Sequence, residues 1–316
     1  MGMPKLWLAP LHGLTLYHFR NCLFKHSSGF NAAISPFMPV QETSKLNVRK
    51  WKDFAPGNNR MMDTIPQLMG IVPAHFADTM HALHEEYGLT RFNWNLGCPM
   101  TQIVRKRRGC GLMPFPDEVE RVVATACKLP YRFSVKLRLG LHSVDEGMEI
   151  IRRMNDYPLD FLVIHPRLGE RQYEGKPDLD ALEKMLSLTR HRVVYSGDIF
   201  QVFDYQMLSQ RFPQVHDWML GRGVLRNPFL AEQIKGIPSA KDYRARFNDF
   251  YEDLKQTLTD YRGVNGTLPV LKELWHYFAR FYRLTEEQLH TLLIIQNPGA
   301  FDAAAKKILS PEICNM

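Results

Sequence analysis

Residues 91–140 have the sequence RFNWNLGCPMTQIVRKRRGCGLMPFPDEVERVVATACKLPYRFSVKLRLG, in which two short apolar segments flank a longer amphipathic one. Arg91–Leu96 and Phe133–Leu139 have the length and the alternating apolar composition of buried strands. Pro116–Lys128 begins with a proline and two acidic residues and repeats its valines at helical spacing. The order strand, helix, strand predicts a parallel βαβ unit.

The same alternation continues on both sides of this unit. Eight strands with intervening helices in about 235 residues favour a (β/α)₈ TIM barrel in the α/β class. An open doubly wound sheet is the alternative, but it normally has a Gly-rich turn after its first strand, where this chain has Pro10 and His12. Residues 38–63, the second crossover, are polar and weakly periodic, and we place no helix there. The predicted strands are Leu6–Ala9, Ala32–Phe37, Ile65–Ile71, Arg91–Leu96, Phe133–Leu139, Phe161–His165, Val193–Ser196 and Trp218–Leu220. The other predicted helices are Thr15–Lys25, Pro73–Tyr87, Val144–Asp156, Leu179–Ser187, Val202–Arg211 and Val224–Gln233.

Strand signals end near Pro238. Four helical stretches follow, punctuated by Gly, Asn and Thr: Ala240–Tyr261, Pro269–Tyr282, Glu286–Leu293 and Gly299–Leu309. The sequence therefore predicts a catalytic barrel domain over residues 1–236 and a small all-helical domain over residues 237–316.

The composition is that of a globular protein, with 45% hydrophobic and 23% charged residues among 316. No apolar run approaches the ~20 residues of a membrane span, and the N-terminus has no signal-peptide pattern. Five cysteines without a CxxC pair argue against a disulfide framework and against a structural metal site. We expect a cytoplasmic, reduced protein without a membrane partner or a metal. The sequence does not fix the oligomeric state, and a monomer is the expectation.

The formal net charge is +7, from 40 basic and 33 acidic residues. Residues 237–316 contain 10 of each sign, so the excess belongs to residues 1–236. One run stands out there: Arg105, Lys106, Arg107 and Arg108. Such a run is either a solvated loop or a contact for the phosphates of a polyanion.

Polar residues at the ends of the predicted strands are candidates for chemistry, because barrel enzymes place their active sites there. Lys136 follows Val135 in an apolar strand, so its side chain points into the barrel or extends to the rim. Inside, it needs an anionic partner such as the ring edge of a reduced flavin, to which Gln67 could also hydrogen-bond. Cys98, in the loop NLGCP, is a candidate nucleophile or proton donor.

The ends of the last two barrel strands resemble a phosphate site. Ser196-Gly197-Asp198 and Gly221-Arg222-Gly223 each form a Gly-rich turn that leads into a helix and exposes backbone N–H groups. Two such turns on adjacent strands, with Arg222 between glycines, favour phosphate binding over a purely structural role of the glycines.

Taken together, these strings resemble the tRNA-dihydrouridine synthase family of flavin enzymes, in order from about residue 6 to 283. The matching strings are LAPLHG (8–13), QLMG (67–70), NLGCP (95–99), Gly109 and Leu112, VKLRLG (135–140), HPRLGERQYEG (165–175), SGDI (196–199), MLGRGVLRNPFL (219–230) and LKELWHYF (271–278). The resemblance implies an FMN-dependent reduction of the C5–C6 double bond of a uridine in the tRNA D-loop, with NADPH as a transient reductant. Hydride would go to C6 and a proton from Cys98 to C5.

The resemblance also implies roles for individual residues. The cofactor residues would be Pro10, Leu11, His12, Gln67, Asn95, Lys136, His165, Ser196, Gly197, Asp198, Gly221 and Arg222. The RNA residues would be Asn95, Arg105, Lys106, Arg107, Arg108, Arg138, Arg167, Tyr173, Lys272 and Arg280. The loop Pro99–Met113 would close over the flipped base, which favours the polyanion interpretation of the basic run.

Four positions depart from the family pattern: Leu11 for Met, His12 for Glu or Ala, Pro166 for Gly within HGR, and Ser196 for Asn. Pro166 has no backbone N–H, and Ser196 is a shorter hydrogen-bonding group, so a rearranged phosphate side is expected. Gln67, Cys98 and Lys136 are all present, so an active enzyme is expected.

The helical region interleaves basic and aromatic residues, which suits RNA binding by phosphate contacts and stacking. Three other functions stay open: the same chemistry on ribosomal RNA, a small-molecule flavin oxidoreductase of the dihydroorotate dehydrogenase type, and a non-enzymatic RNA chaperone. The interleaved residues are Tyr243, Arg244, Arg246, Lys272, Trp275, Tyr277, Arg280, Tyr282 and Arg283.

Overall fold

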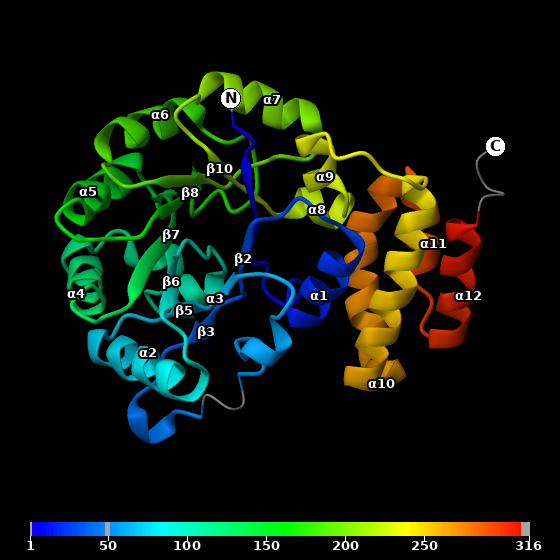
Figure 1. The fold of residues 1–316 in the computed structure, drawn as a ribbon, viewed down its shortest axis with the longest axis horizontal. Coiled ribbons are helices and arrows are strands. Elements are labelled where there is room, and N and C mark those ends of the chain that lie inside the picture. Colours follow the sequence, from blue (N-terminus) through cyan, green and yellow to red (C-terminus); the bar gives the residue numbers. More distant parts are fainter. Residues whose placement is uncertain (1, 48–50, 311–316) are drawn as a thin grey trace.

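The computed structural model describes residues 2–47 and 51–310, so Cys314 lies outside the described residues. Ten strand segments form one parallel sheet in the order β3-β5-β6-β7-β8-β9-β10-β1-β2-β4. The first strand lies beside the last, since Leu8 of β1 (Lys5–Leu8) pairs with Leu220 of β10 (Asp217–Leu220). Figure 1 shows α2, α4, α5, α6 and α7 around the outside of the sheet and α10–α12 on one side.

Two barrel strands consist of two pieces each. β2 (Ala32–Ile34) pairs with β4 (Thr64–Ile65), and β3 (Met38–Pro39) pairs with β5 (Gln67–Met69). Only Pro66 separates β4 from β5, and proline has no N–H to donate to a neighbouring strand. Because β5 also pairs with β6 (Arg91–Leu96), the ring closes through this divided strand. The predicted TIM barrel is thereby confirmed.

The longest ladder runs along the middle of the chain. β6 pairs with β7 (Arg132–Gly140) from Arg91↔Arg132 to Leu96↔Leu137. The remaining strands are β8 (Leu162–Leu168) and β9 (Val193–Tyr195). Every predicted strand has a counterpart, and Arg91–Leu96 is found with the predicted bounds.

The helices follow the predicted amphipathic stretches closely. α2 begins at Pro73 and ends before Gly88, whose φ of 67° terminates the helix in the left-handed region. Among the helices around the barrel one prediction was wrong: the stretch Val224–Gln233 is two helices, interrupted from Asn227 to Phe229. In the helical region, the two helices predicted over Ala240–Tyr261 and Pro269–Tyr282 are one bent helix. The helices around the barrel are α1 (Tyr17–His26), α2 (Pro73–Tyr87), α3 (Thr101–Val104), α4 (Pro116–Ala126), α5 (Val144–Met154), α6 (Leu179–Leu188), α7 (Val202–Arg211), α8 (Arg222–Arg226) and α9 (Leu230–Lys235).

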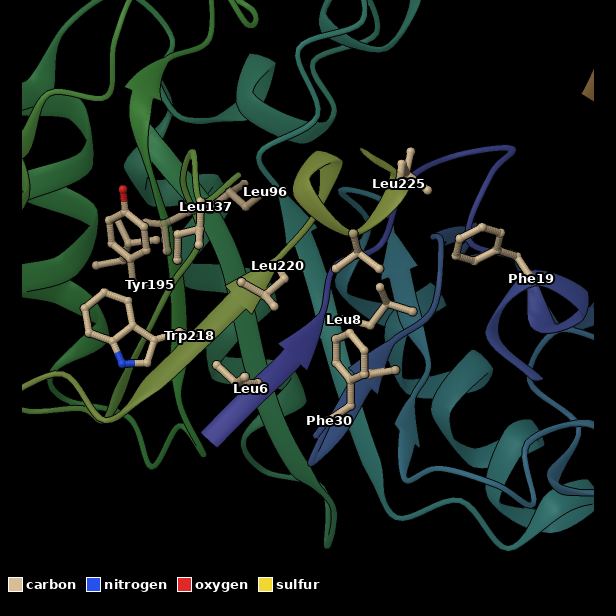
Figure 2. Close-up of a cluster of buried hydrophobic side chains, with 14 of the residues drawn as sticks. Leu6, Leu8, Phe19, Phe30, Leu96, Leu137, Tyr195, Trp218, Leu220 and Leu225 are labelled. Atoms are coloured by element: carbon tan, nitrogen blue, oxygen red, sulfur yellow. The ribbon is translucent and has the colours of Figure 1, made fainter. Parts of the chain in front are cut away.

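Two apolar layers hold the barrel. Inside, a cluster that includes Trp7, Phe161 and Met219 fills the lower part of the barrel. Outside, side chains of the opposite strand faces pack under the helices; Figure 2 shows Leu6, Leu8 and Leu220 between Trp218 on one side of the view and Phe19 on the other. Above the inner apolar cluster, the inward positions turn polar, which confines the chemistry to one end of the barrel.

The helical region packs against the barrel at α1 and α8. It consists of α10 (Tyr243–Tyr282), which bends at Gly263 (φ 69°), α11 (Glu286–Leu293) and α12 (Pro298–Leu309). Arg246 of α10 donates two hydrogen bonds to the buried carboxylate of Glu232 in α9. The hydrophobic core is continuous across this junction. The domain division at residues 236 and 237 stays a prediction.

Candidate active site

Two adjoining hollows, with empty volumes of about 480 and 710 Å³, open over the carboxyl ends of the strands. They form one cleft, because five residues line both: Pro10, Leu11, Lys136, His165 and Tyr173. The first hollow extends over the turns after β9 and β10. The second extends over the turns after β1 and β6, where Cys98 lies. The topology thus brings most of the predicted site residues together.

Lys136 lies at the centre of the cleft. Its Cα pairs with Asn95 of β6 and Val163 of β8, and its side chain lines both hollows. No carboxylate pairs with its ammonium among the residues the structure describes. Burial, and next to it the charge of Arg138, lowers the pKa of Lys136 to about 7. An anionic ligand beside the ammonium would act against this lowering of the pKa, so the cleft is suited to receive negative charge.

Substituting Lys136→Met should stabilise the cofactor-free protein in a pH-dependent way. In the unfolded chain Lys136 titrates near its ordinary pKa of 10.5, so between about 7 and 10.5 unfolding takes up a proton. The wild-type protein therefore gains stability as the pH rises through this window, whereas the variant has no such group. We expect the Tm of the variant to exceed that of the wild type at pH 6–7 and the gap to narrow towards pH 10. Thermal unfolding followed across this range measures it. A gap that does not change with pH would contradict the assignment.

A network of two arginines and one carboxylate forms the wall of the first hollow. Asp198 accepts hydrogen bonds from Arg167 and, at 2.6 Å, from Arg222. Burial acts to raise the pKa of Asp198, but the hydrogen bonds and charges of both arginines lower it below its ordinary value. Two cations against one anion leave a net positive charge beside the cavity.

His165 is held neutral in this wall. Burial, and then the charges of Arg138 and Lys136, lower its pKa well below the ordinary value. Arg167 can only donate, so His165 Nε2, at 3.1 Å from it, accepts. The proton of the neutral ring consequently resides on Nδ1, which is available as a donor.

The turns after β9 and β10 provide unpaired backbone donors. The N–H groups of Gly197, Asp198 and Gly221 have no protein acceptor in the described part of the chain. At Gly197 and Gly223 a Cβ would lie 2.2 Å from Tyr195 Oη and 2.0 Å from the Ile199 carbonyl oxygen. Glycine is therefore required at both positions, and the exposed N–H groups with Arg222 suit a phosphate.

Cys98 lies half-buried on the loop that rims the second hollow. Its backbone N–H donates to Asn95 Oδ1 at 2.9 Å, and its carbonyl accepts from the Cys110 N–H at 3.2 Å. Burial raises the pKa of the Cys98 thiol, and the charges of Arg138 and Lys136 offset this only in part. The group is consequently a protonated thiol at neutral pH.

Arg138 supports this loop instead of reaching into solvent. It is 1% exposed and donates to the carbonyls of Gly97, Leu168 and Gln172. Its guanidinium also lies 5.4 Å from the ring centre of Tyr173. Arg138 thereby ties the loop after β6 to the loop after β8.

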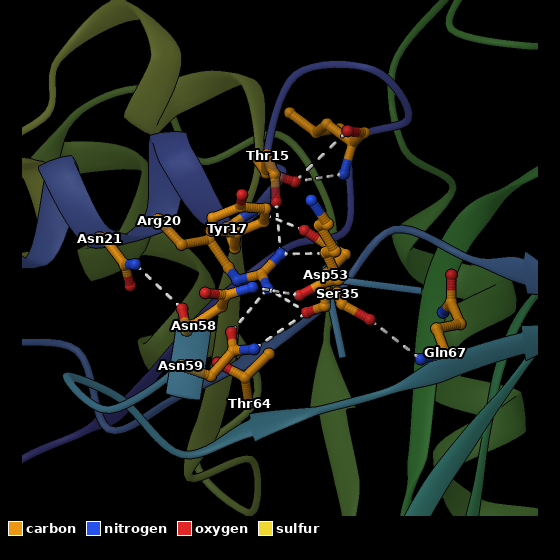
Figure 3. Close-up of polar contacts among 12 residues, drawn as sticks. Thr15, Tyr17, Arg20, Asn21, Ser35, Asp53, Asn58, Asn59, Thr64 and Gln67 are labelled. Carbon is orange, nitrogen blue, oxygen red and sulfur yellow. Dashed lines mark hydrogen bonds and ion pairs between the residues drawn. The ribbon is translucent and has the colours of Figure 1, made fainter. Parts of the chain in front are cut away.

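The turn after β1 is held by a buried polar network (Figure 3). Thr15 Oγ1 donates to the Ala9 carbonyl and accepts from the Leu11 N–H. Arg20 donates to the Thr15 carbonyl and pairs with Asp53 Oδ2 at 3.0 Å. This network fixes Pro10 and Leu11 along the cleft, and His12 stacks on Phe37 at 4.9 Å.

Gln67 lies below the cleft, fully buried, and lines neither hollow. Its amide bonds to Asn93 and Asn95, with Ser134 next to Asn93. Sequence reasoning did not single out Asn93 or Ser134. The spacing of Asn93 and Asn95, two residues apart in one strand, could have shown that both point inward.

The comparisons with known proteins agree with this geometry. A family model described as dihydrouridine synthase (Dus) matches residues 7–293. The chain belongs to the dihydrouridine synthase family.

Similar proteins cover most of the chain. The tRNA-dihydrouridine(16) synthase of Cupriavidus necator is 24% identical over 95% of this chain and 99% of that protein. The tRNA-dihydrouridine(16) synthase of Pseudomonas putida is 26% identical over 85% and 80%. tRNA-dihydrouridine synthase B of Pasteurella multocida is 25% identical over 74% and 69%. The solved structure of TcOYE with pHBA has a TM-score of 0.51 at 10% identity, covering 79% of this chain and 95% of that chain, and supports the fold.

In this family member the basic run lies on the loop beyond Cys98. Arg105 and Lys106 are exposed. Arg107 (φ 53°) pairs with Glu118 and lies over the ring of Phe115 at 3.7 Å. Arg108 is half-buried. Arg105 and Lys106 are consequently the members of the run best placed for a phosphate.

The helical region divides its basic and aromatic residues between the core and the surface. Trp275 and Tyr282 are buried, so a stacking role does not apply to them. Arg280 is exposed, Lys272 is half-buried, and both belong to the second half of α10. Arg246 forms a salt bridge with Glu232 at the junction with the barrel.

Among residues 2–47 and 51–310, no group of three or more potential ligands could hold a metal ion. None of the helices in this part of the chain is long and apolar enough to cross a membrane.

Proposed function

We propose that this protein reduces the C5–C6 double bond of a D-loop uridine in tRNA, with FMN as cofactor and NADPH as the transient reductant. The observation that carries the proposal is the protonated thiol of Cys98 at the rim of a cleft centred on the unpaired Lys136. Family membership over residues 7–293 and the names of the relatives support it.

The cleft has the groups that FMN requires. The first hollow, with the free N–H groups of Gly197, Asp198 and Gly221 and the charge of Arg222, would hold the phosphate. Lys136 would neutralise the ring edge, and the turn after β1 would lie along the ring. When bound, FMN supplies the hydride that uracil C6 receives. The remaining cofactor residues would be Pro10, Leu11, His12, Gln67, Asn95, His165 and Ser196, with Gln67 acting from below the cleft.

Cys98 would complete the reduction as a general acid. Its thiol delivers a proton to C5 of the uracil, and the thiol is restored by a proton from solvent. The raised pKa keeps the proton on sulfur until it is needed. Arg138 and Lys136 would stabilise negative charge on the ring electrostatically. Asn95 would hold the Cys98 loop next to the face of the flavin ring at which the uracil binds.

The RNA would bind across the Cys98 loop and towards the helical region. A base inside folded RNA cannot reach the cleft, so the target uridine is flipped out of its stack. Arg105 and Lys106 would contact phosphates near the flipped base, with Arg107, Arg108, Arg167 and Tyr173 behind them. Lys272 and Arg280 would contact the RNA from the helical side. The cytoplasmic location and the monomeric state stay predictions.

The basic run should account for part of the salt dependence of tRNA binding. Substituting Arg105→Gln together with Lys106→Gln should lower the slope of log Kd against log salt by about two, because each side chain neutralises one phosphate in the wild type. The exposed pair Lys184 and Arg190, substituted in the same way, is the matched control. Fluorescence anisotropy of labelled tRNA over a range of salt measures the slopes. Equal slopes for both double variants would contradict the proposed phosphate binding.

The whole proposal is tested by mapping dihydrouridine in RNA from cells that lack the protein. Loss of dihydrouridine at one or more tRNA positions, restored by the wild-type chain, is the expected result. Loss in ribosomal RNA with intact tRNA would assign the other RNA class. An unchanged map in both RNAs, together with turnover of free uridine or orotate by the purified protein, would overturn the proposal in favour of a small-molecule enzyme.

A further inference from the structure

Below the cleft, four side chains form one continuous chain of hydrogen bonds between two backbone groups of the barrel interior, the Phe92 carbonyl and the Cys98 N–H. Ser134 Oγ donates to the Phe92 carbonyl at 3.1 Å, and Asn93 Nδ2 donates to Ser134 Oγ at 2.9 Å. Gln67 Nε2 donates to Asn93 Oδ1 at 2.7 Å, and the Gln67 N–H donates to Ser35 Oγ at 3.2 Å.

The chain then rises to the cleft through a fourth side chain. Asn95 Nδ2 donates to Gln67 Oε1 at 2.8 Å. The oxygen of the same amide accepts from the backbone N–H of Cys98 at 2.9 Å and from that of Gly97 at 3.2 Å. Gln67, Asn93, Asn95 and Ser134 are each less than one tenth exposed, so water does not compete for these bonds.

The two backbone ends fix the direction of every bond between them. A carbonyl at Phe92 can only accept, and an N–H at Cys98 can only donate. Each amide and the hydroxyl must therefore donate towards Phe92 and accept from the side of Cys98. The strand register supports this arrangement, because the Cα of Asn93 pairs with those of Gln67 and Ser134 on its two sides.

We infer that Asn93 and Ser134 are positioning residues for the Cys98 loop, acting through the amides of Gln67 and Asn95. Neither residue lines the cleft. If Asn93 Oδ1 is removed, the Gln67 amide loses the hydrogen bond that fixes its orientation, and its oxygen is no longer held towards Asn95. A reversed Gln67 amide turns Asn95, and the N–H groups of Gly97 and Cys98 lose their acceptor.

The inference rests on the proposed function only for the chemical use of Cys98; the placement of the loop can be tested without it. Alkylation of Cys98 by iodoacetamide, measured by peptide mass spectrometry on the protein without RNA or NADPH, reports how tightly the loop holds the half-buried thiol. In Asn93→Leu, which has a similar volume and no acceptor, we expect alkylation at Cys98 to accelerate on the order of tenfold. Asn93→Asp keeps an acceptor for Gln67 but loses the donor to Ser134, so its alkylation rate should lie between those of the wild type and Asn93→Leu.

A second variant and a control keep the test decisive. Ser134→Ala removes the acceptor of Asn93 Nδ2 and should also accelerate alkylation at Cys98. This variant tests the inference if Asn93→Leu does not fold. Asn155→Leu removes an amide that bonds to Leu188 and Arg190 outside the barrel mouth, and should alkylate at the wild-type rate. Equal Cys98 alkylation in the wild type, Asn93→Leu and Ser134→Ala overturns the inference.

Uridine reduction on tRNA is the second readout. A positioning role predicts that Asn93→Leu lowers kcat more than it raises KM, and that Asn93→Asp, which keeps the acceptor for Gln67, recovers part of kcat. If alkylation accelerates in the variants but the wild-type protein reduces no uridine, the inference is upheld and only the proposed function is contradicted.

Discussion

Cys98→Ala is expected to lower the rate of uridine reduction about 100- to 10,000-fold, the usual contribution of a positioned general acid. The substitution removes the only thiol that lines the cleft among the described residues, and it leaves the Asn95 bonds to the loop backbone intact. Single-turnover measurement of dihydrouridine in unmodified tRNA gives the rate. The proposed reduction of the flavin by NADPH, which needs no proton from Cys98, should continue.

Two further variants sharpen this result. Cys127→Ala removes a half-buried thiol at the end of α4, outside the cleft lining, and should reduce uridine at the wild-type rate. Cys98→Ser keeps a hydroxyl, a weaker acid than the thiol, and should fall between wild type and Cys98→Ala. If Cys98→Ala works at the wild-type rate, the proton comes from another group.

Asp53→Asn is expected to destabilise the fold by ~3–5 kcal/mol, the cost of leaving a buried charge without its partner. The guanidinium of Arg20 has side-chain exposure of 1%, and Asp53 is its only carboxylate among the described residues. The Tm should fall by on the order of 10 °C, measured by thermal unfolding. Because the network holds the turn at Pro10 and Leu11, affinity for flavin should fall with it.

The size of this effect can be separated from that of an ordinary ion pair. Asp180→Asn breaks the exposed pair with Arg211 and should leave the Tm nearly unchanged. Combining Arg20→Met with Asp53→Asn removes both charges and should recover part of the lost stability. A Tm for Asp53→Asn equal to that of Asp180→Asn would mean that the buried pair contributes little.

The sequence predicted the barrel well because its strands are short apolar segments with distinct boundaries. Arg91–Leu96 is found residue for residue, and Lys136 lies inside the barrel, as its apolar neighbours indicated. The division of the second and third strands was not predicted, since it depends on which neighbour each half pairs with.

The site was predicted less completely, for physical reasons. A strand pattern shows that Gln67 points inward, but its depth below the cleft depends on the register with β6. The spacing of aromatic residues along a helix does not show which helix face packs against the rest of the protein. It therefore could not show that Trp275 and Tyr282 lie in the core and are not available for base stacking. The pairing of Arg107 with Glu118 needed the turn of the loop in three dimensions.

The ladder between β1 and β10 joins Lys5 to Asp217 and Leu8 to Leu220. During synthesis β1 emerges well before β10, so most of the barrel is made before the partner strand of β1 exists. Until β10 is made, Gly221 is not yet in place beside the turn at Pro10, and the first hollow of the cleft is incomplete. A nascent or truncated chain that ends before β10 is therefore expected to have an open sheet edge and no cofactor site, which makes it a substrate for chaperones or proteases.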